Sequence, residues 1–478
     1  MQMPSDLATI HIVGIGGIGM SAIAEILRAK GFGVQGSDQK ESPNVRRLAS
    51  KGIKVFVGHA AANLTEASFV VISTAVKDDN PELQAARARG LPIIRRAEML
   101  AELMRLYKTI SVTGTHGKTT TSSLISHIFE KAGQDPTVIT GGIINSWGSN
   151  ARLGHGEWMI VEADESDGTF VKIPTQIGVV TNMDPEHLDY FGSVENMYAE
   201  YEAFYRNVPF YGLTVSCIDQ PVVREMLERL RLRRNGRRLI TYGQNSDADM
   251  VLLDARVEGS ATVFNARLSD RVGGGQRPLI EWMVPVPGTH NALNALAAIA
   301  VAAEAGISDE AIKSALASFE GVKRRFQRTG EWQGVAIYDD YGHHPIEINA
   351  VLRATKSGAK GRVIAVVEPH RYSRLKDLFP DFCRCFKSAD EVVVIPLYSA
   401  GEAPLDGISS ASLADGIRAQ SGKTVATVSD VGQLAELLKQ HTKAGDIVVC
   451  LGAGVSTEWA HDLPRLMGGE AAAGAQTA

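Results

Sequence analysis

The amino-acid sequence predicts an α/β protein of three domains with mainly parallel sheets. Apolar runs rich in β-branched residues alternate with helix-period stretches along the chain, which is typical of βαβ units. At roughly 150 residues per domain, 478 residues suggest about three domains. The pattern breaks near residues 105–108 and near Gly321, so we predict domains at 1–106, 107–321 and 322–478.

The predicted strands are short, and helices fall between many of them. In MSAIAEILRAKG and TTTSSLISHIFEKAG the apolar residues recur at helical spacing, and Gly133 is a natural stop for the second helix. The irregular stretch 247–287 favours an antiparallel hairpin appended to the middle domain, and 466–478 a disordered tail. The strands expected, in order, are ATIHIVG, KVFVG, FVVIST, KTISVTG, WMIVEAD, IGVVTNM, GVAIYDD, RVIAVVEP, DEVVVIP and DIVVCLGAG.

Composition excludes several classes of function. A net charge of −5 argues against a nucleic acid as the main partner, and no apolar run is long enough to span a membrane. The beginning, MQMPSDLATIHIVGIGG, lacks the basic region of a signal peptide. The four cysteines (Cys217, Cys383, Cys385 and Cys450) form no CxxC pair, which favours buried thiols in a reducing compartment. We therefore expect a cytoplasmic protein without membrane insertion.

The first glycine-rich loop, GIGGIG from Gly14 to Gly19, follows a predicted strand and opens a helix. Glycines let the backbone approach a diphosphate, whose charge is favoured at a helix N-terminus. Asp38 lies where an acid that binds a ribose is expected in such a unit. A tight strand–helix turn without a ligand is the alternative. The motif indicates a diphosphate and does not specify NAD.

The second loop, TGTHGKTT from Thr113 to Thr120, is the stronger signal. Strand KTISV leads into a turn whose N–H groups can bind phosphate, Lys118 can reach a terminal phosphate, and the hydroxyl of Thr119 can bind Mg²⁺. Val112 stands where the standard GxxxxGK[ST] pattern has its first glycine, so the loop is a shorter variant. It predicts binding of a nucleoside triphosphate.

Acidic residues follow the strand WMIVEAD. Magnesium on a triphosphate usually takes one or two carboxylates plus phosphate oxygens and waters. Glu162, Asp164, Glu165 and Asp167 are candidates, and the pattern alone does not choose among them. His187, in TNMDPEHLDYFGS, is a candidate for a second metal site, although a single histidine is more often a helix cap or a packed side chain.

Further polar clusters lie at the ends of predicted elements. Asn291 and Asn294 share one face of a helix whose first turn also contains His290, which suggests a ligand contact beyond simple capping. VKRRFQRTGE is either a solvated linker or the source of an arginine for phosphoryl transfer. Arg371 and Arg374 of HRYSR suit bidentate binding of a carboxylate.

Taken in order, eight segments make the chain similar to the Mur ligases over nearly its full length. They are HIVGIGGIGMSAIAEIL, SVTGTHGKTTTS, VEADESDGTF, TNMDPEHLDYFGS, GTHNALNALAA, KRRFQRTGE, YDDYGHHPIE and EPHRYSRLKDLF. The resemblance implies a Rossmann-like UDP-sugar domain, a central P-loop ATPase-like domain and a C-terminal Rossmann-like domain that binds the amino acid. It further implies an ATP-dependent carboxylate–amine ligase of peptidoglycan precursor synthesis.

Within that family the chain is most similar to the alanine-adding branch. The resemblance then implies that the lactyl carboxylate of UDP-N-acetylmuramate is phosphorylated by ATP, and that the amine of L-alanine attacks the acyl phosphate. The resemblance further implies ATP, two Mg²⁺ ions and these two substrates as the ligands, and a protein that is a monomer or homodimer.

The site residues that the resemblance implies fall into five groups. Lys118, Arg325 and Asp340 would be catalytic. Thr119, Glu162 and His187 would bind two Mg²⁺ ions. ATP would be bound by Gly114, Thr115, His116, Gly117, Lys118, Thr119, Thr120, His290, Asn291, Asn294, Arg325 and Asp340. Gly14, Gly16, Gly17, Ile18, Gly19, Ser37, Asp38 and Ser73 would bind the UDP-sugar, and His344, His370, Arg371 and Arg374 the amino acid and substrate.

Three alternatives stay open at this point. A recycling ligase that joins a whole tripeptide to the same UDP-sugar would share the P-loop. A nicotinamide-dependent dehydrogenase would explain GIGGIG and Asp38 but would leave TGTHGKTT unused. A nucleotide-gated scaffold without catalysis would leave unexplained why Lys118, Glu162 and Arg325 occur together.

Overall fold

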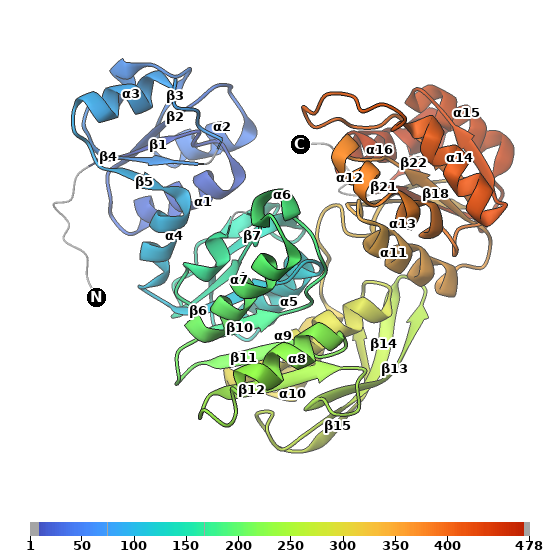
Figure 1. Cartoon of the computed structure of the whole chain (residues 1–478), viewed down its shortest axis with the longest axis horizontal. Coiled ribbons are helices and arrows are strands. Elements are labelled where there is room, and N and C mark those ends of the chain that lie inside the picture. Colours follow the sequence, from blue (N-terminus) through green and yellow to red (C-terminus); the bar gives the residue numbers. More distant parts are fainter. Residues whose placement is uncertain (1–8, 74, 167, 473–478) are drawn as a thin grey trace. The chain divides into compact units, whose positions relative to one another are not determined.

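A computed structural model describes residues 9–73, 75–166 and 168–472 of the chain (Figure 1). Within these ranges the strands form three sheets of five, ten and seven strands, one after another along the sequence. Helices separate most of the parallel strands, which confirms the predicted three-domain α/β fold. By contact density the chain divides into two compact units, and the central sheet contributes residues to both.

The N-terminal sheet has the order β3-β2-β1-β4-β5, and all its strand pairs are parallel. Parallel neighbours bring the carboxyl ends of β1, β2 and β4 to one edge, where the strand order reverses beside β1. Its elements are β1 Thr9–Val13, α1 Ile18–Ala29, β2 Val34–Asp38, α2 Pro43–Ser50, β3 Lys54–Val57, the 3₁₀ helix η1 Ala61–Leu64, β4 Ala67–Ile72, α3 Pro81–Ala88, β5 Ile93–Arg95 and α4 Arg96–Met104.

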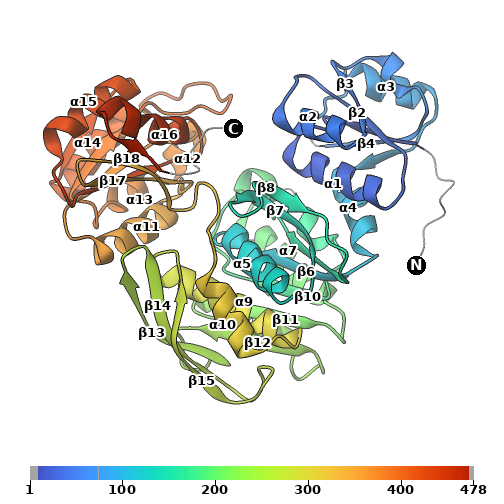
Figure 2. The same cartoon turned by 180° about the vertical axis from the view of Figure 1, so that it is seen from behind.

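The central sheet has the order β15-β14-β13-β12-β11-β10-β6-β9-β7-β8, with β6 between the parallel strands β10 and β9. Helices α7 and α8 cover one face (Figure 1), and α5, α9 and α10 lie on the other (Figure 2). The elements up to residue 217 are β6 Lys108–Thr113, α5 Lys118–Lys131, β7 Thr137–Ile144, β8 Ser149–Arg152, β9 Trp158–Glu162, η2 Thr169–Val171, β10 Ile177–Val180, α6 Leu188–Phe191, α7 Val194–Asn207 and β11 Leu213–Cys217.

The stretch 247–287 contains the predicted antiparallel hairpin and adds a third strand to it. It forms three consecutive strands that continue the central sheet beyond β12, with β13 parallel to β12. A connection of only two residues joins β13 to β14, so this adjacent pair is antiparallel. The elements are α8 Pro221–Leu230, β12 Arg238–Gly243, β13 Met250–Glu258, β14 Ala261–Leu268, β15 Arg277–Val284, α9 Thr289–Glu304 and α10 Asp309–Ala317.

The C-terminal sheet has the order β20-β19-β18-β21-β17-β16-β22. Strands β17 to β20 and β21 are parallel, whereas β16 is antiparallel to β17. Its elements are β16 Gln327–Trp332, β17 Val335–Asp340, α11 Pro345–Gly358, β18 Val363–Val367, α12 Tyr372–Asp377, α13 Phe379–Arg384, β19 Glu391–Val394, α14 Ser410–Ser421, β20 Thr424–Thr427, α15 Val431–His441, β21 Ile447–Leu451, α16 Ser456–Met467 and β22 Glu470–Ala471.

The predicted disordered tail at 466–478 is wrong for its first part. Leu466 and Met467 complete α16, and β22 pairs antiparallel with β16. A small-residue composition hides this pairing, because an edge strand needs backbone hydrogen bonds more than a hydrophobic pattern. The last six residues lie outside the described part of the chain.

Two other expectations can be checked directly. All four cysteines are buried and have free thiols, as predicted. Among the residues described, no helix is both long and apolar enough to span a bilayer.

Candidate active site

The predicted P-loop lies at the carboxyl end of β6, where the N-terminus of α5 begins. Gly114 has φ of 126° and Gly117 has φ of 82°, conformations that non-glycine residues rarely adopt. A Cβ atom on Gly114 would lie 2.1 Å from Thr181 Oγ1, so only glycine fits where the loop passes over β10. Parallel pairing of β6 with β9 and β10 places Glu162 and Thr181 at the same edge as the loop.

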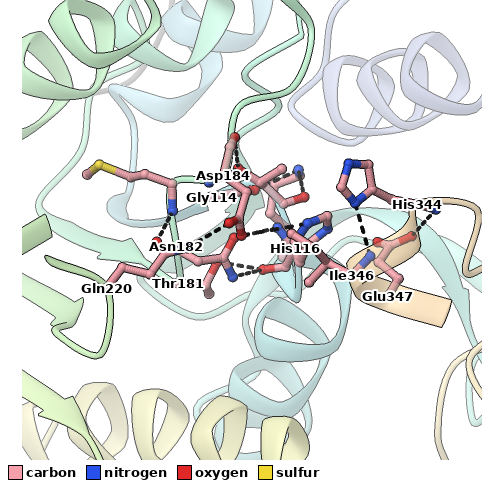
Figure 3. A network of polar contacts seen from close by, with 12 residues as sticks. Gly114, His116, Thr181, Asn182, Asp184, Gln220, His344, Ile346 and Glu347 are labelled. Atoms are coloured by element: carbon pink, nitrogen blue, oxygen red, sulfur yellow. Dashed lines mark hydrogen bonds and ion pairs between the residues drawn. The ribbon is translucent and has the colours of Figure 1, made fainter. Parts of the chain in front are cut away.

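Side chains that follow β10 hold the loop in place (Figure 3). Asn182 accepts a hydrogen bond from His116 N at 2.8 Å and donates one to His116 O at 2.9 Å. Thr181 donates to the same carbonyl at 2.6 Å, and Thr115 Oγ1 exchanges two bonds of 2.9 Å with the backbone of Asp184. Gln220 fixes Asp184 in turn, with a bond of 2.8 Å to its carboxylate. Side chains of the central domain therefore fix the conformation of the loop.

Lys118 lies in the first turn of α5 and points back over the loop. Its ammonium donates to the carbonyls of Gly114 (2.7 Å) and Thr115 (3.1 Å) and to Glu165 Oε1 (2.8 Å). Burial alone would lower the pKa of Lys118, but the charges of Glu165, Asp164 and Glu162 outweigh it and raise that pKa above its ordinary value. A protonated amine at this point can bind a phosphate oxygen.

Two carboxylates lie beside the loop in different ways. Glu162, at the end of β9, accepts from Thr119 Oγ1 at 3.0 Å and from Gly141 N at 2.6 Å. Glu165 is 2% exposed, and its Oε2 atom is buried without a hydrogen-bond partner. Burial raises the pKa of Glu165 to about 7 against the opposing effect of Lys118. His187 lies 3.9 Å from Glu165 Oε1 in a left-handed conformation, with φ of 56°.

This donor set fits Mg²⁺ on a bound triphosphate. Hydroxyl and carboxylate oxygens are its preferred ligands, and the ion usually keeps most of its coordination for phosphates and water. In the described ranges no three His, Cys, Asp or Glu side chains form a metal cluster by themselves. Thr119 and Glu162 are adjacent as expected, whereas His187 faces Glu165, which the resemblance had not selected.

The N-terminal glycine loop is held by the end of β2. Gly14 N and Ile15 N donate to Ser37 O at 2.8 and 2.9 Å, and Gly16 N donates to Asp38 Oδ2 at 2.8 Å. A Cβ atom on Gly16 would lie 2.9 Å from that same carboxylate oxygen. No side chain in the described part of the chain caps α1, so its first N–H groups can face an anion.

Other residues predicted to contact the UDP-sugar are placed differently. Gly17 is exposed, and Gly19 is the second residue of α1, where an added Cβ would lie 3.0 Å from Arg96 Nη1. Ile18 is the first residue of that helix. Ser73 follows β4 and is partly exposed. The Ser37 side chain is fully buried and donates to Glu82 at 2.5 Å, so it faces the domain interior.

In the C-terminal sheet, Asp340 ends β17 and closes a tight local structure with the segment before β16. It accepts from Phe326 N at 2.8 Å and from Gly342 N at 2.7 Å. Burial raises its pKa to about 6, and the charge of Arg325 opposes that shift. The Arg325 guanidinium lies 5.1 Å from the centre of the Tyr341 ring, a cation–π contact. Arg324 and Phe326 on either side have positive φ, a strain that is common at functional sites.

Two buried side-chain amides lie at the start of α9. Asn291 donates to Pro287 O at 2.8 Å and accepts from Asn294 at 3.2 Å, and both asparagines are 7% exposed. Burial lowers the pKa of His290 to about 4, with Arg353 and Arg325 acting in the same direction. His290 is therefore neutral at physiological pH.

The remaining predicted residues lie before α11 and around α12. His344 is 5% exposed, and its Nδ1 accepts from Ile346 N at 3.3 Å as the cap of α11 (Figure 3). His370 stacks on Tyr398 with ring centres 5.3 Å apart, and burial lowers its pKa to about 4. Arg374 lies 3.3 Å from His370 Nδ1, and Arg371 has φ of 67° at the start of α12.

Sequence reasoning missed several residues that build these sites. Asn182 and Gln220 fix the P-loop, Glu165 pairs with Lys118, and Tyr398 stacks on His370. Glu165 was visible only as one of four acidic candidates. Tyr398 follows β19, and only this position after the carboxyl end of a strand could have marked it as a site residue.

Three α/β sheets in series, with a P-loop on the central one and a glycine loop on the first, define a nucleotide-dependent α/β enzyme. Family models match three successive parts of the chain: "Mur ligase family, catalytic domain" at 9–108, "Mur ligase middle domain" at 112–302, and "Mur ligase, glutamate ligase domain" at 324–454. The chain belongs to the Mur ligase family.

Known members of this family agree over most of the chain. A UDP-N-acetylmuramate–L-alanine ligase of Methylobacterium nodulans is 53% identical over 97% of this chain and 98% of its own length. The crystal structure of the UDP-N-acetylmuramate-alanine ligase from Thermotoga maritima matches with a TM-score of 0.77 and 28% identity, covering 96% of this chain and 99% of its own. A UDP-N-acetylmuramate:L-alanyl-γ-D-glutamyl-meso-diaminopimelate ligase from Neisseria meningitides gives 0.57 and 29%, over 66% of this chain and all of its own.

Proposed function

We propose that the protein joins L-alanine to the lactyl carboxylate of UDP-N-acetylmuramate with hydrolysis of ATP to ADP and phosphate, a step of peptidoglycan precursor synthesis. The observation that carries the proposal is 53% identity, over 97% of the chain, to a ligase named for this reaction. Among the solved structures, the tripeptide ligase matches with a lower TM-score and over less of this chain than the alanine ligase from Thermotoga maritima. The P-loop geometry supports the use of ATP.

In this proposal each domain takes one substrate. Residues 1–106 bind the UDP-sugar through the glycine loop, 107–321 bind ATP through the P-loop, and 322–478 bind L-alanine. Two features support the first assignment. Asp38 fixes the glycine loop, and the N-terminus of α1 can present N–H groups to an anion. Arg371 and Arg374 support the third, since guanidinium groups suit an amino-acid carboxylate.

The reaction follows from two chemical needs. A carboxylate is a poor acylating agent, so its oxygen first attacks the γ-phosphorus of ATP, and ADP leaves. The amine of alanine then attacks the carbonyl carbon of the acyl phosphate; a tetrahedral intermediate loses phosphate, the nitrogen loses a proton, and an amide remains. Lys118 and Arg325 would stabilise the negative charge that spreads over the transferring phosphoryl group.

Two Mg²⁺ ions complete the proposed site. Thr119 and Glu162 would bind one ion, and Glu162 and His187 the second, with Glu165 close enough to His187 to take part. When bound, the metal neutralises phosphate charge during transfer. Asp340 holds the backbone around Arg325, while Asn291 and Asn294 present amides at the start of α9 for the nucleotide. We further propose a cytoplasmic bacterial enzyme that acts as a monomer or homodimer.

The test is phosphate release from ATP with UDP-N-acetylmuramate and Mg²⁺, comparing L-alanine with the tripeptide L-Ala-γ-D-Glu-meso-diaminopimelate. We expect release with L-alanine, together with a product of the mass of UDP-N-acetylmuramoyl-L-alanine. Release with the tripeptide alone would assign the protein to the recycling branch, and release with neither would refute both.

A further inference from the structure

A buried carboxylate in the N-terminal domain has no part in the proposed chemistry. Glu82, in the first turn of α3, is fully buried and accepts hydrogen bonds from Ser37 Oγ (2.5 Å) and Asn63 Nδ2 (2.6 Å). His59 Nδ1 lies 3.2 Å away and His11 Nε2 lies 3.5 Å away. Glu82 in α3 therefore contacts side chains of three other elements, namely β1, β2 and η1.

The donors and acceptors around Glu82 can be assigned from the contacts of His11. The side-chain nitrogen of Gln35 donates to Asn63 O at 3.0 Å and lies 3.2 Å from His11 Nδ1. An amide N–H₂ group can only donate, so His11 Nδ1 accepts and the proton of a neutral ring is on Nε2, which faces Glu82. These contacts lower the pKa of Glu82 to about 2 although burial acts in the opposite direction. The carboxylate is charged whenever the protein is folded near neutral pH.

The same network reaches the glycine loop through one residue. Ser37 binds Glu82 with its side chain, and its carbonyl accepts from Gly14 N and Ile15 N. The next residue, Asp38, accepts from Gly16 N. The end of β2 is thus bound by its Ser37 side chain to the buried Glu82 carboxylate, and its Ser37 carbonyl and Asp38 carboxylate hold the glycine loop.

We propose that Glu82 is a positioning residue that sets the affinity for the UDP end of the sugar nucleotide, acting through Ser37 on the glycine loop. The inference rests on the proposed function, since it takes the loop to bind the diphosphate. Glu82 itself is fully buried and touches no substrate. Without its charge, the end of β2 is free to shift, and the loop N–H groups lose the fixed spacing that a diphosphate needs.

The test compares Glu82→Gln with the unchanged protein. We expect the KM for UDP-N-acetylmuramate, and the Kd for UDP measured by calorimetry, to rise about tenfold (~1.4 kcal/mol). The kcat and the KM values for ATP and L-alanine should stay within about twofold. Asp249→Asn is the matched control, because Asp249 is a buried carboxylate of the central sheet that accepts two bonds of 2.8 Å from Thr241. It should leave the KM for the UDP-sugar unchanged.

A double-mutant cycle separates positioning from general destabilisation. If Glu82 acts through Ser37, then Ser37→Ala alone should raise the same KM, and Glu82→Gln with Ser37→Ala should be no worse than the larger single effect. Independent, additive effects would overturn the inference, as would an unchanged UDP affinity in Glu82→Gln. Should Glu82→Gln fail to fold, Ser37→Ala and Asn63→Ala each remove one bond to the carboxylate and carry the same test.

The two proposals fail in different ways. If the unchanged protein neither binds UDP nor turns over UDP-N-acetylmuramate, the proposed function is wrong and this inference with it. If the unchanged protein does both and the Glu82 and Ser37 variants match it, only the inference is wrong.

Discussion

At the scale of the residue, Lys118 is the cation that the proposed function places against the transferring phosphoryl group. Its three hydrogen bonds go to two loop carbonyls and Glu165, all of which a phosphate group would compete with. The pairing keeps the amine protonated and pointing over the loop. An incoming triphosphate exchanges one anionic partner for another, which costs little reorganisation.

Replacing Lys118 should therefore remove transition-state stabilisation while leaving the fold intact. We expect Lys118→Ala to lower kcat for phosphate release by roughly 10²–10³-fold or more, the range seen when one preorganised donor is lost. Lys108→Ala is the control, because Lys108 is the first residue of the strand that leads into the P-loop but forms an exposed pair with Glu157. An unchanged rate in Lys118→Ala would refute the P-loop assignment.

Glu82 leads to a second prediction at this scale, on pH and stability. Its pKa is lowered from 4.5 to about 2 in the folded state. Because the folded value lies below the unfolded one, the stabilisation is fully present above pH 4.5 and is lost as the pH falls through about 2. It is on the order of 3 kcal/mol at neutral pH.

The measurement is hydrogen exchange of the amides in 9–38 for the unchanged protein and for Glu82→Gln, from pH 7 to pH 2. We expect a large difference in protection at pH 7 that shrinks steadily below pH 4.5. His11 and His59 are the titratable groups that face Glu82, and both remain in the variant. A difference that stays constant down to pH 2 would show that the carboxylate charge contributes nothing.

At the scale of the element, the shape of the P-loop depends on the backbone conformation of its glycines. Gly114 and Gly133 both have positive φ, but only Gly114 is also enclosed, by Thr181 and the backbone of Asn182. Gly133 ends α5 with open space around its Cα. An alanine at Gly133 would therefore meet only the strain of a left-handed backbone, whereas an alanine at Gly114 would also displace the loop from β10.

We therefore expect Gly114→Ala to weaken ATP binding at least tenfold, whereas Gly133→Ala should cost about 1 kcal/mol of stability and leave the KM for ATP unchanged. Calorimetry with a non-hydrolysable ATP analogue measures the first effect, and urea unfolding the second. Equal ATP affinities in the two variants would contradict the view that the contact with β10 shapes the loop.

Elements were easier to predict than the partners of individual side chains. The ten predicted strands are all present, because β-branched runs between helices report burial directly. Helix α5 departs from the predicted amphipathic stripe: its serines and threonines are buried too, with Ser126 donating to Ser122 O at 2.7 Å. Such local bonds let small polar residues face a core, and no hydrophobic pattern shows this.

The site residues that could be predicted are those whose neighbours in the site are also neighbours in the sequence. Lys118 and Thr119 were predictable because loop, strand and helix are contiguous in sequence. The pairing of Lys118 with Glu165 was not, since it joins residues 47 apart whose meeting depends on sheet order. His344 was expected on the substrate side, and its role as a helix cap depends on the exact start of α11.

At the scale of the whole molecule, the proposed reaction brings three reactants together through one unstable intermediate. An acyl phosphate is hydrolysed readily by water, so productive ligation requires that the bound intermediate meet an amine before it meets solvent. The chain must therefore form the acyl phosphate from the UDP-sugar and ATP, and then protect it.

This argument gives the last prediction. With UDP-N-acetylmuramate, ATP and Mg²⁺ but no L-alanine, added hydroxylamine should capture the acyl group as a hydroxamate, detected by mass spectrometry, in an amount that depends on ATP. Phosphate release without any amine should stay at least about tenfold below the complete reaction, because the protected intermediate waits for a nucleophile. Lys118→Ala should form no hydroxamate. Hydroxamate that forms without ATP, or none with it, would contradict an acyl-phosphate route and require the amide to form in a single step.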